Sequence, residues 1–229
     1  MRLRARRRYR RGMTPSPASP RGTRSAGAAR LVLGAAIIAI LMLTYLRGGA
    51  ANGYNPFDYF GFFTNLTSLL AAVILIIAGA LGMKGRPAPD LLVGARAVAT
   101  ACMLLVAVIY NGLVPGTGSA PVWVSVTLHG VFPALMALDW LVVGDRGPVP
   151  WSRFWILLPY PVLWLAVVLV RGATDGWVPY GFLLPERGAG AITLTALGLL
   201  GALGVAGMLV WAASRLPGVL GARSATMKQ

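Results

Sequence analysis

Two residues in separate apolar segments, a threonine and a histidine, are the best candidates for chemistry in this chain. His129 is the single histidine, and Thr64 lies in an earlier apolar segment. Imidazole is the side chain best suited to take a proton from a hydroxyl near neutral pH. A threonine hydroxyl is a weak nucleophile unless such a base lies within hydrogen-bond reach. The pair therefore suggests attack of Thr64 on a carbonyl group, with His129 as general base.

Further polar side chains accompany the threonine. Thr64, Thr67 and Ser68 follow the i, i+3, i+4 spacing that places three hydroxyls on one face of a helix. We expect substrate-binding roles for Thr67 and Ser68, and also for Asn65 and Tyr160. The structural alternative is that the hydroxyls bond to their own helix backbone or to a neighbouring helix.

Pro133 and Asp139 follow the histidine in the same apolar run. The ring of Pro133 excludes the helical hydrogen bond to the His129 carbonyl and tends to bend the helix. Such a bend opens space beside the imidazole, or it only shapes the bundle around a structural histidine. Asp139 is about 15 Å further along a helix, too far to orient the ring. We expect it to form a structural ion pair with Arg96, because unpaired charges at membrane depth are costly.

Composition places these residues in a membrane protein. Of the 229 residues, 57% are hydrophobic and 12% are charged, whereas a soluble domain is about 45–50% apolar and about 25% charged. The single cysteine, Cys102, excludes an internal disulfide and a cysteine metal cluster. A single histidine argues against a histidine-rich zinc site or bis-histidine haem. We expect no metal and no cofactor.

Six apolar segments are long enough, at about 17–25 residues each, to cross a bilayer as helices. They are continuous and rich in Leu, Ala and Val, unlike the alternating strands of a membrane barrel. The sequence therefore predicts an all-α polytopic membrane protein with a six-helix transmembrane bundle at 28–214. The expected spans are 28–46, 57–82, 91–114, 122–143, 154–170 and 191–213.

Basic residues predict the orientation of the spans and the nature of the tails. Ten of the 21 basic residues are arginines within the first 30 positions. We expect 1–27 to be a disordered Arg/Pro-rich cytoplasmic tail, and 215–229 to be a short cytoplasmic tail. A nucleic-acid partner is not expected, since no groove-reading motif accompanies the arginines. The connections at 84–90 and 144–153 are also basic, which predicts a plasma-membrane protein with both termini cytoplasmic.

This orientation places the two candidate catalytic residues at one depth. The second and fourth spans both run inward, so Thr64 and His129 would each lie roughly 10–12 Å below the outer surface. Asp58, Tyr110 and Asn111 are candidates to line the mouth of a pocket there. The expected partners are the lipid bilayer and a lipid substrate. The small residues of the last span allow close packing within the bundle or a homodimer.

Four motifs carry a family resemblance. They are Phe63-Thr64-Asn65-Leu66-Thr67-Ser68, His129 with Pro133 and Asp139-Trp140, Tyr160-Pro161-x-x-Trp164, and Gly176-Trp177-Val178-Pro179-Tyr180. Over about residues 30–215 the chain resembles the bacterial six-span membrane proteins called the Pr-six-Pr family. More distantly, it is similar to the eukaryotic androgen-induced-protein family, which are multi-span hydrolases of fatty-acid esters of hydroxy fatty acids. That similarity implies catalytic roles for Thr64 and His129, although here the proline is one residue closer to the histidine.

The leading hypothesis is thus an intramembrane lipid-ester hydrolase that uses a Thr/His pair. Two other classes stay open. One is a transport or proton-relay protein that uses Asp58, His129 and Asp139. The other is a membrane scaffold without turnover, in which the polar residues only tie helices together.

Overall fold

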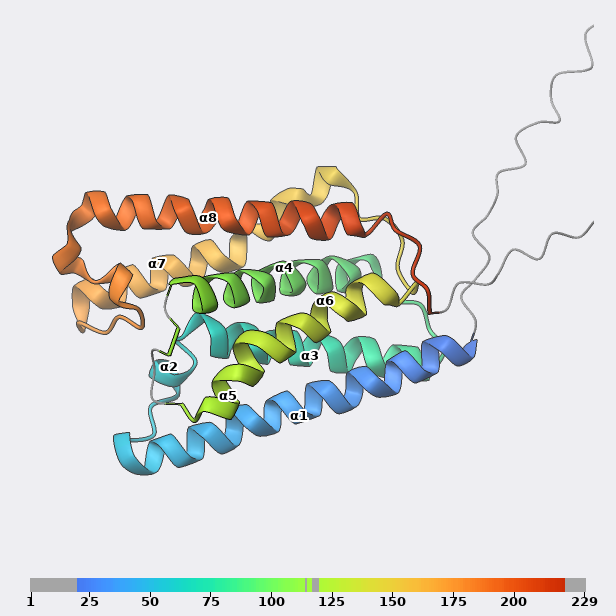
Figure 1. The fold of residues 1–229 in the computed structure, drawn as a ribbon, viewed down its shortest axis with the longest axis horizontal. Coiled ribbons are helices and arrows are strands. Elements are labelled where there is room, and N and C mark those ends of the chain that lie inside the picture. Colours follow the sequence, from blue (N-terminus) through green and yellow to red (C-terminus); the bar gives the residue numbers. More distant parts are fainter. Residues whose placement is uncertain (1–19, 114, 117–119, 221–229) are drawn as a thin grey trace, which may run out of the picture.

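The structure is a computed structural model that describes residues 20–113, 115–116 and 120–220. Within these residues, six helices are long and apolar enough to cross a membrane, and they lie along one axis (Figure 1). The predicted all-α fold with six spans is confirmed. The candidate spans are Arg24–Ala50, Phe63–Met83, Asp90–Leu113, Val122–Val142, Trp151–Thr174 and Pro185–Ala213.

Several spans are built from more than one helical segment. The α-helices are α1 (Pro20–Asn52), α2 (Pro56–Tyr59), α3 (Phe63–Met83), α4 (Asp90–Leu113), α5 (Val122–Val126), α6 (Phe132–Val142), α7 (Pro159–Thr174) and α8 (Gly188–Ala213). A π-helix, η1 (Thr127–Val131), joins α5 to α6. The 3₁₀ segments are η2 (Trp151–Leu157), η3 (Gly181–Leu183) and η4 (Pro185–Arg187).

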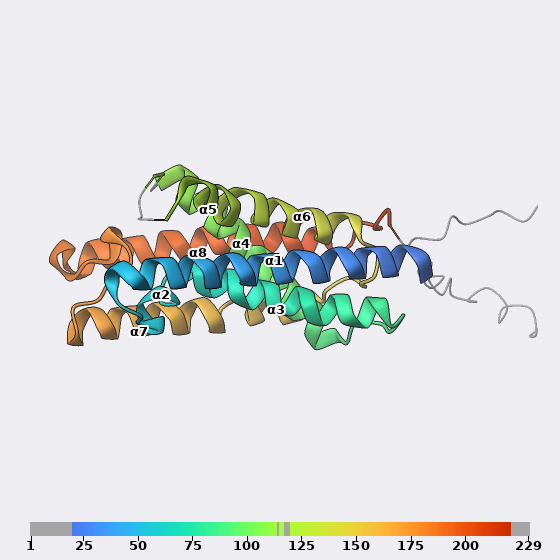
Figure 2. The same cartoon turned by 90° about the horizontal axis from the view of Figure 1, so that it is seen from below.

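Both described ends of the chain lie at the same end of the bundle (Figures 1 and 2). We name this the inner end, after the predicted orientation, and the opposite end the outer end. α1 begins at Pro20, so residues 20–27 are helical and not a disordered tail as expected. The rest of that tail, 1–19, lies outside the described residues, as does 221–229 of the C-terminal tail.

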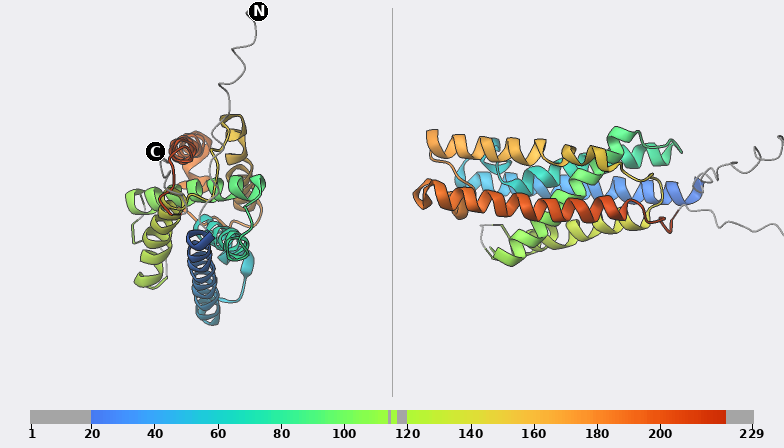
Figure 3. Two further views of the ribbon diagram at one scale, coloured as in Figure 1. Left: turned by 90° about the vertical axis from the view of Figure 1, so that its right-hand side faces the viewer. Right: turned by 90° about the horizontal axis from the view of Figure 1, so that it is seen from above.

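α4 is the central helix of the bundle. It contacts α3, α6 and α8 (Figure 3), and it separates two hydrophobic clusters. Ala97, Ala101 and Cys102 pack toward α8, whereas Ala99 and Met103 pack toward α1 and α3. Residues from opposite faces of α4 thus belong to different cores, which fixes the helices around it.

α1 and α3 approach each other closely because glycines face glycines. A Cβ atom on Gly79 would lie 2.7 Å from the Gly27 carbonyl oxygen, and one on Gly27 would lie 2.8 Å from the Gly79 carbonyl oxygen. Neither position has room for a side chain. Small residues at such contacts let helix backbones pack in a membrane, where no hydrophobic effect drives helices together.

Gly79→Val is therefore expected to lower the free energy of unfolding by about 1–3 kcal/mol, the usual cost of overpacking. The measurement is thermal unfolding of the purified protein in detergent. Gly201→Val is the matched control, because a Cβ on Gly201 meets no atom within 4 Å. Equal melting temperatures for the two variants would contradict the close α1–α3 contact.

The second predicted span is broken near its outer end. The expected helix at 57–82 consists of α2, a turn around Gly61, and α3. The indole Nε1 of Trp164 donates to the Gly61 carbonyl oxygen at 2.8 Å, and a Cβ on Gly61 would collide with the Trp177 ring. The turn therefore needs glycine, and it starts α3 one residue before Thr64.

The fourth span contains the π-helix where a proline kink was expected. The Phe132 N–H donates to the Thr127 carbonyl, which is an i+5 hydrogen bond. Pro133 follows directly and begins α6 with an imino nitrogen that has no proton to donate. One extra residue is thereby accommodated in the helix at His129, and such π segments occur frequently at functional sites.

Candidate functional site at the outer end

Two cavities lie in the outer half of the bundle. The outer cavity has a volume of about 1310 Å³ and is lined from α1, α4, α5, η1, α8 and the loop before α8. The apolar pocket, of about 70 Å³, lies among α3, α4, α7 and α8. The residues that line both cavities are Thr64, Ile109, Tyr110, Tyr180, Phe182 and Leu199. The two cavities therefore meet around Thr64.

Thr64 is the polar residue of α3 at this junction. It is buried, in the first turn of α3, with its side chain between the outer cavity and the apolar pocket. The Tyr180 hydroxyl hydrogen bonds to the Thr64 side chain and to the backbone of Phe63 and Thr64. Burial raises the pKa of Tyr180, and these hydrogen bonds only partly offset that rise. Tyr180 is thus a neutral hydroxyl at neutral pH.

His129 lines the outer cavity with its ring orientation fixed. Its Nδ1 lies 2.9 Å from the Ser125 carbonyl oxygen. Because a carbonyl only accepts, Nδ1 carries the proton of the neutral ring and Nε2 keeps a lone pair. The ring also stacks on Tyr110, with centroids 3.5 Å apart and planes 10° from parallel. The orientation leaves Nε2 as the nitrogen that can act as a base.

The carbonyl that Pro133 leaves without a helical partner is satisfied by α4. Asn111 Nδ2 donates to the His129 carbonyl oxygen at 3.0 Å and to the Ala107 carbonyl oxygen at 2.8 Å. Asn111, expected at a pocket mouth, thus ties the π-helix to α4. This bond and the Tyr110 stack hold His129 in place from one neighbouring helix.

The structure brings Thr64 and His129 to one cavity but does not join them directly. Both line the outer cavity. Among the described residues, the hydrogen bonds of the His129 ring and of the Thr64 hydroxyl go to Ser125 and Tyr180 and not to each other. Tyr110 is the residue shared between them, since it stacks on His129 and lines both cavities with Thr64.

The remaining hydroxyls expected at the site lie deeper, between helices. Thr67 Oγ1 is 2.8 Å from the Tyr160 hydroxyl, which joins α3 to α7. Ser68 Oγ donates to Met103 Sδ at 3.9 Å, which joins α3 to α4. In the described part of the chain, these three hydroxyl residues line neither cavity. Asn65 lines the outer cavity, and its Nδ2 donates to the Tyr59 carbonyl oxygen at 2.9 Å. Substrate binding by these residues stays a prediction.

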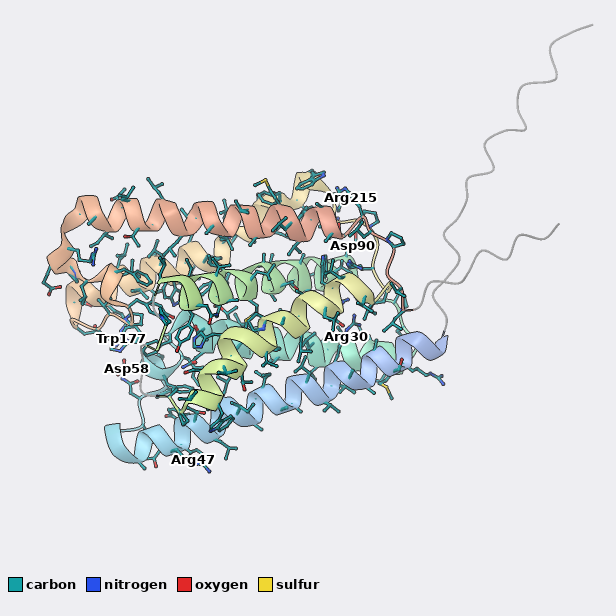
Figure 4. The ribbon with its side chains drawn as sticks, viewed as in Figure 1. Arg30, Arg47, Asp58, Asp90, Trp177 and Arg215 are labelled. Atoms are coloured by element: carbon teal, nitrogen blue, oxygen red, sulfur yellow. The ribbon has the colours of Figure 1, made fainter. Side chains whose placement is uncertain are left out.

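A cluster of four charges lies at the inner end, far from His129 along its span. Arg96 Nη2 is 2.8 Å from Asp139 Oδ2, and Arg30 Nε is 2.7 Å from Asp139 Oδ1. Both arginines also bind Asp145, with Arg96 Nη1 3.1 Å from its Oδ1. Arg30 and Arg96 are only 3% and 1% exposed. Figure 4 labels Arg30 at this end of the bundle. The inner charge cluster is electrically balanced, with two arginines and two aspartates.

Sequence reasoning named two members of the inner charge cluster and missed Arg30 and Asp145. Arg30 appeared to belong to the basic N-terminal stretch, and Asp145 to a polar connection. A usable signal was present, because the chain has only six acidic residues and two of them flank the end of the fourth span. Two carboxylates there favour two cations from other apolar segments.

Comparisons of the chain with protein-family models, with curated proteins and with solved structures find no match. Within the described residues, no group of three or more His, Cys, Asp or Glu side chains could hold a metal ion. The protein is an integral membrane protein by the length and composition of its six helices. Its further function is therefore argued from the outer-end geometry alone.

Proposed function

We propose that this membrane protein hydrolyses an ester of a lipid, with Thr64 as nucleophile and His129 as general base. The observation that carries the proposal is the place of Thr64, where the apolar pocket opens into the cavity that contains His129. An acyl chain fits the first, and a polar group fits the second. An ester carbonyl between the two parts of such a lipid would then lie at Thr64.

The residues present support each step of that reaction. His129 Nε2 takes the proton of the Thr64 hydroxyl as the oxygen attacks the ester carbonyl. The imidazolium then gives this proton to the leaving alkoxide, which departs as an alcohol and leaves the acyl group on Thr64. Water, deprotonated by the same nitrogen, releases the acid and restores both residues. Catalytic hydrogen bonds are often long in the free enzyme and tighten with substrate.

A covalent probe tests the nucleophile. We expect a fluorophosphonate to label the purified protein in detergent and Thr64→Ala to abolish the label, because the phosphonate traps an activated hydroxyl. Thr127→Ala is the control, since Thr127 lies in the same π-helix as His129 but donates to the Trp123 carbonyl oxygen at 2.7 Å. Labelling that survives Thr64→Ala would refute the assignment.

A lipid-binding or transport function without turnover is the second candidate. It is favoured by the hydrogen bonding of the Thr64 side chain to Tyr180 and not to His129. The wild-type protein would then bind a lipid ester without releasing acid. A proton relay through Asp58 and Asp139 has less support, because each carboxylate is already paired with arginine.

The membrane and the orientation also belong to the proposal. Basic residues in the connections at the inner end, Lys84, Arg86, Arg146 and Arg153, support a cytoplasmic inner end in the plasma membrane. A homodimer through the small residues of α8 stays a prediction.

A further inference from the structure

The loop between α7 and α8 holds two aromatic rings where the cavities meet. Tyr180 and Phe182 line both cavities, and their rings stack with centroids 5.1 Å apart. Tyr180 also packs edge-on against Phe62 at 5.7 Å and against Trp164 at 6.0 Å. The Tyr180 ring is thus held among aromatic side chains from three parts of the chain, with its hydroxyl at Thr64.

An ion-pair cluster fastens this loop to the turn before α3. Arg171 Nη2 is 2.8 Å from Asp58 Oδ1, and Arg171 Nε is 2.9 Å from Asp175 Oδ2. The guanidinium lies 4.2 Å from the Trp177 ring centroid, and Trp177 covers Gly61. Asp58 and Trp177 lie near each other at the outer end (Figure 4). We name Asp58, Arg171, Asp175 and Trp177 the latch.

The latch is built to hold the loop without locking it. The N–H of Trp177 and the Arg171 guanidinium hold the pKa of Asp175 below its ordinary range, so this carboxylate stays charged. All of the latch charges are partly exposed, and exposed ion pairs are weak and exchange readily with water. Loops of this kind open and close over a site on a fast timescale.

The other side of the junction is fixed. Tyr110 and Ile109 come from α4, the central helix, and Leu199 comes from α8. A chain that enters the apolar pocket from the outer cavity must therefore pass between these helical residues and the two loop rings. The loop is the side that can move.

We propose that Tyr180 is a specificity-determining residue that controls entry of an acyl chain into the apolar pocket at Thr64, and that the latch sets how often this passage opens. The inference rests on the proposed function, because it takes Thr64 as the reacting residue. It names the substrate class more narrowly, as a lipid whose single acyl chain passes Tyr180 to reach the nucleophile.

Alkylation of a thiol at position 64 tests the passage without requiring turnover. Thr64→Cys is treated in detergent with N-ethylmaleimide and with hexadecyl maleimide, and both rates are followed by mass spectrometry. Cys102 is 0% exposed and gives the unreactive background. We expect Tyr180→Ala to raise the hexadecyl rate relative to the short reagent about tenfold, equivalent to a barrier lowered by about 1.4 kcal/mol. Arg171→Gln should raise it in the same direction, and Tyr180→Phe should leave it unchanged.

The control is Tyr54→Ala, an outer-end aromatic that lines neither cavity among the described residues. An unchanged ratio of rates in both Tyr180→Ala and Arg171→Gln would overturn the proposal. Should Tyr180→Ala not fold, the half-buried Arg171 variant decides the question alone. Failure of the wild-type protein to hydrolyse any lipid ester would refute the proposed function, and the alkylation ratios would still report on the passage.

Discussion

Asp139→Asn is expected to lower the free energy of unfolding by about 3–5 kcal/mol, the cost of breaking a buried ion pair by removing one partner. Asp139 receives hydrogen bonds from both Arg30 and Arg96, each nearly fully buried. Asparagine keeps the size of the side chain but removes the negative charge. The inner charge cluster is then left with two arginines and one aspartate, an uncompensated positive charge inside the bundle.

The chain provides a reporter and a control for this measurement. Cys102 is buried in the core, so a fluorogenic maleimide reacts with it only on unfolding. Asp90→Asn is the matched control, because Asp90 also pairs with an arginine at the inner end, but both partners are exposed. We expect about 0–1 kcal/mol there. Arg30→Gln combined with Asp139→Asn restores neutrality and should recover part of the loss. Equal effects of Asp139→Asn and Asp90→Asn would contradict this account.

Acid should weaken the same cluster. Burial disfavours the Asp145 carboxylate, but the hydrogen bond from Arg30 and the charge of Arg96 outweigh it, so the pKa of Asp145 lies below its ordinary value of 3.8. A lowered folded pKa means that the contribution of Asp145 to stability is complete above that ordinary value. It is lost as the pH falls through the folded pKa. The effect of Asp139→Asn should therefore be measured near neutral pH.

His129→Gln is expected to lower kcat/KM for a lipid ester by about 10²–10⁴-fold, the usual contribution of a general base. Glutamine can still donate to the Ser125 carbonyl, but it cannot accept a proton near neutral pH. The rate of the wild-type protein should rise with pH as the imidazole loses its proton, and that rise should be absent from the variant. The measurement is acid release across a pH series in detergent.

Ser125→Ala is the matched control for the histidine. Ser125 lines the same cavity, and it holds the imidazole through its backbone carbonyl, which the substitution keeps. Its kcat/KM should stay close to that of the wild-type protein. A His129→Gln variant with wild-type kcat/KM would remove the histidine from the mechanism, whatever the outcome at Thr64.

The six spans could be predicted because hydropathy needs only composition and length. The interruptions could not. The turn at Gly61 lies in an aromatic run, Phe60-Gly61-Phe62-Phe63, that is as apolar as the helix after it. The π-helix at His129 leaves hydropathy unchanged, since it alters only which carbonyl each N–H bonds. Pro133 indicated a freed carbonyl at His129, but not that Asn111 of α4 would satisfy it.

For the site, helix geometry was enough to predict a shared depth for Thr64 and His129, and they line one cavity. The contacts of Tyr180 with Thr64 and of Arg30 with Asp139 were beyond it. The second of these joins residues 109 positions apart. Spacing along one helix carries no information about such pairs, which depend on how a loop folds back or how two helices pack.

The π-helix separates the fourth span into two halves with independent phase. One additional residue in a helix turns everything before it by about 100° relative to everything after it. Val124 and Leu128 can thus face α1 and α3 while Trp140 faces α8. A chain with this arrangement can vary what its outer half presents to a ligand, and its inner half keeps the same partners.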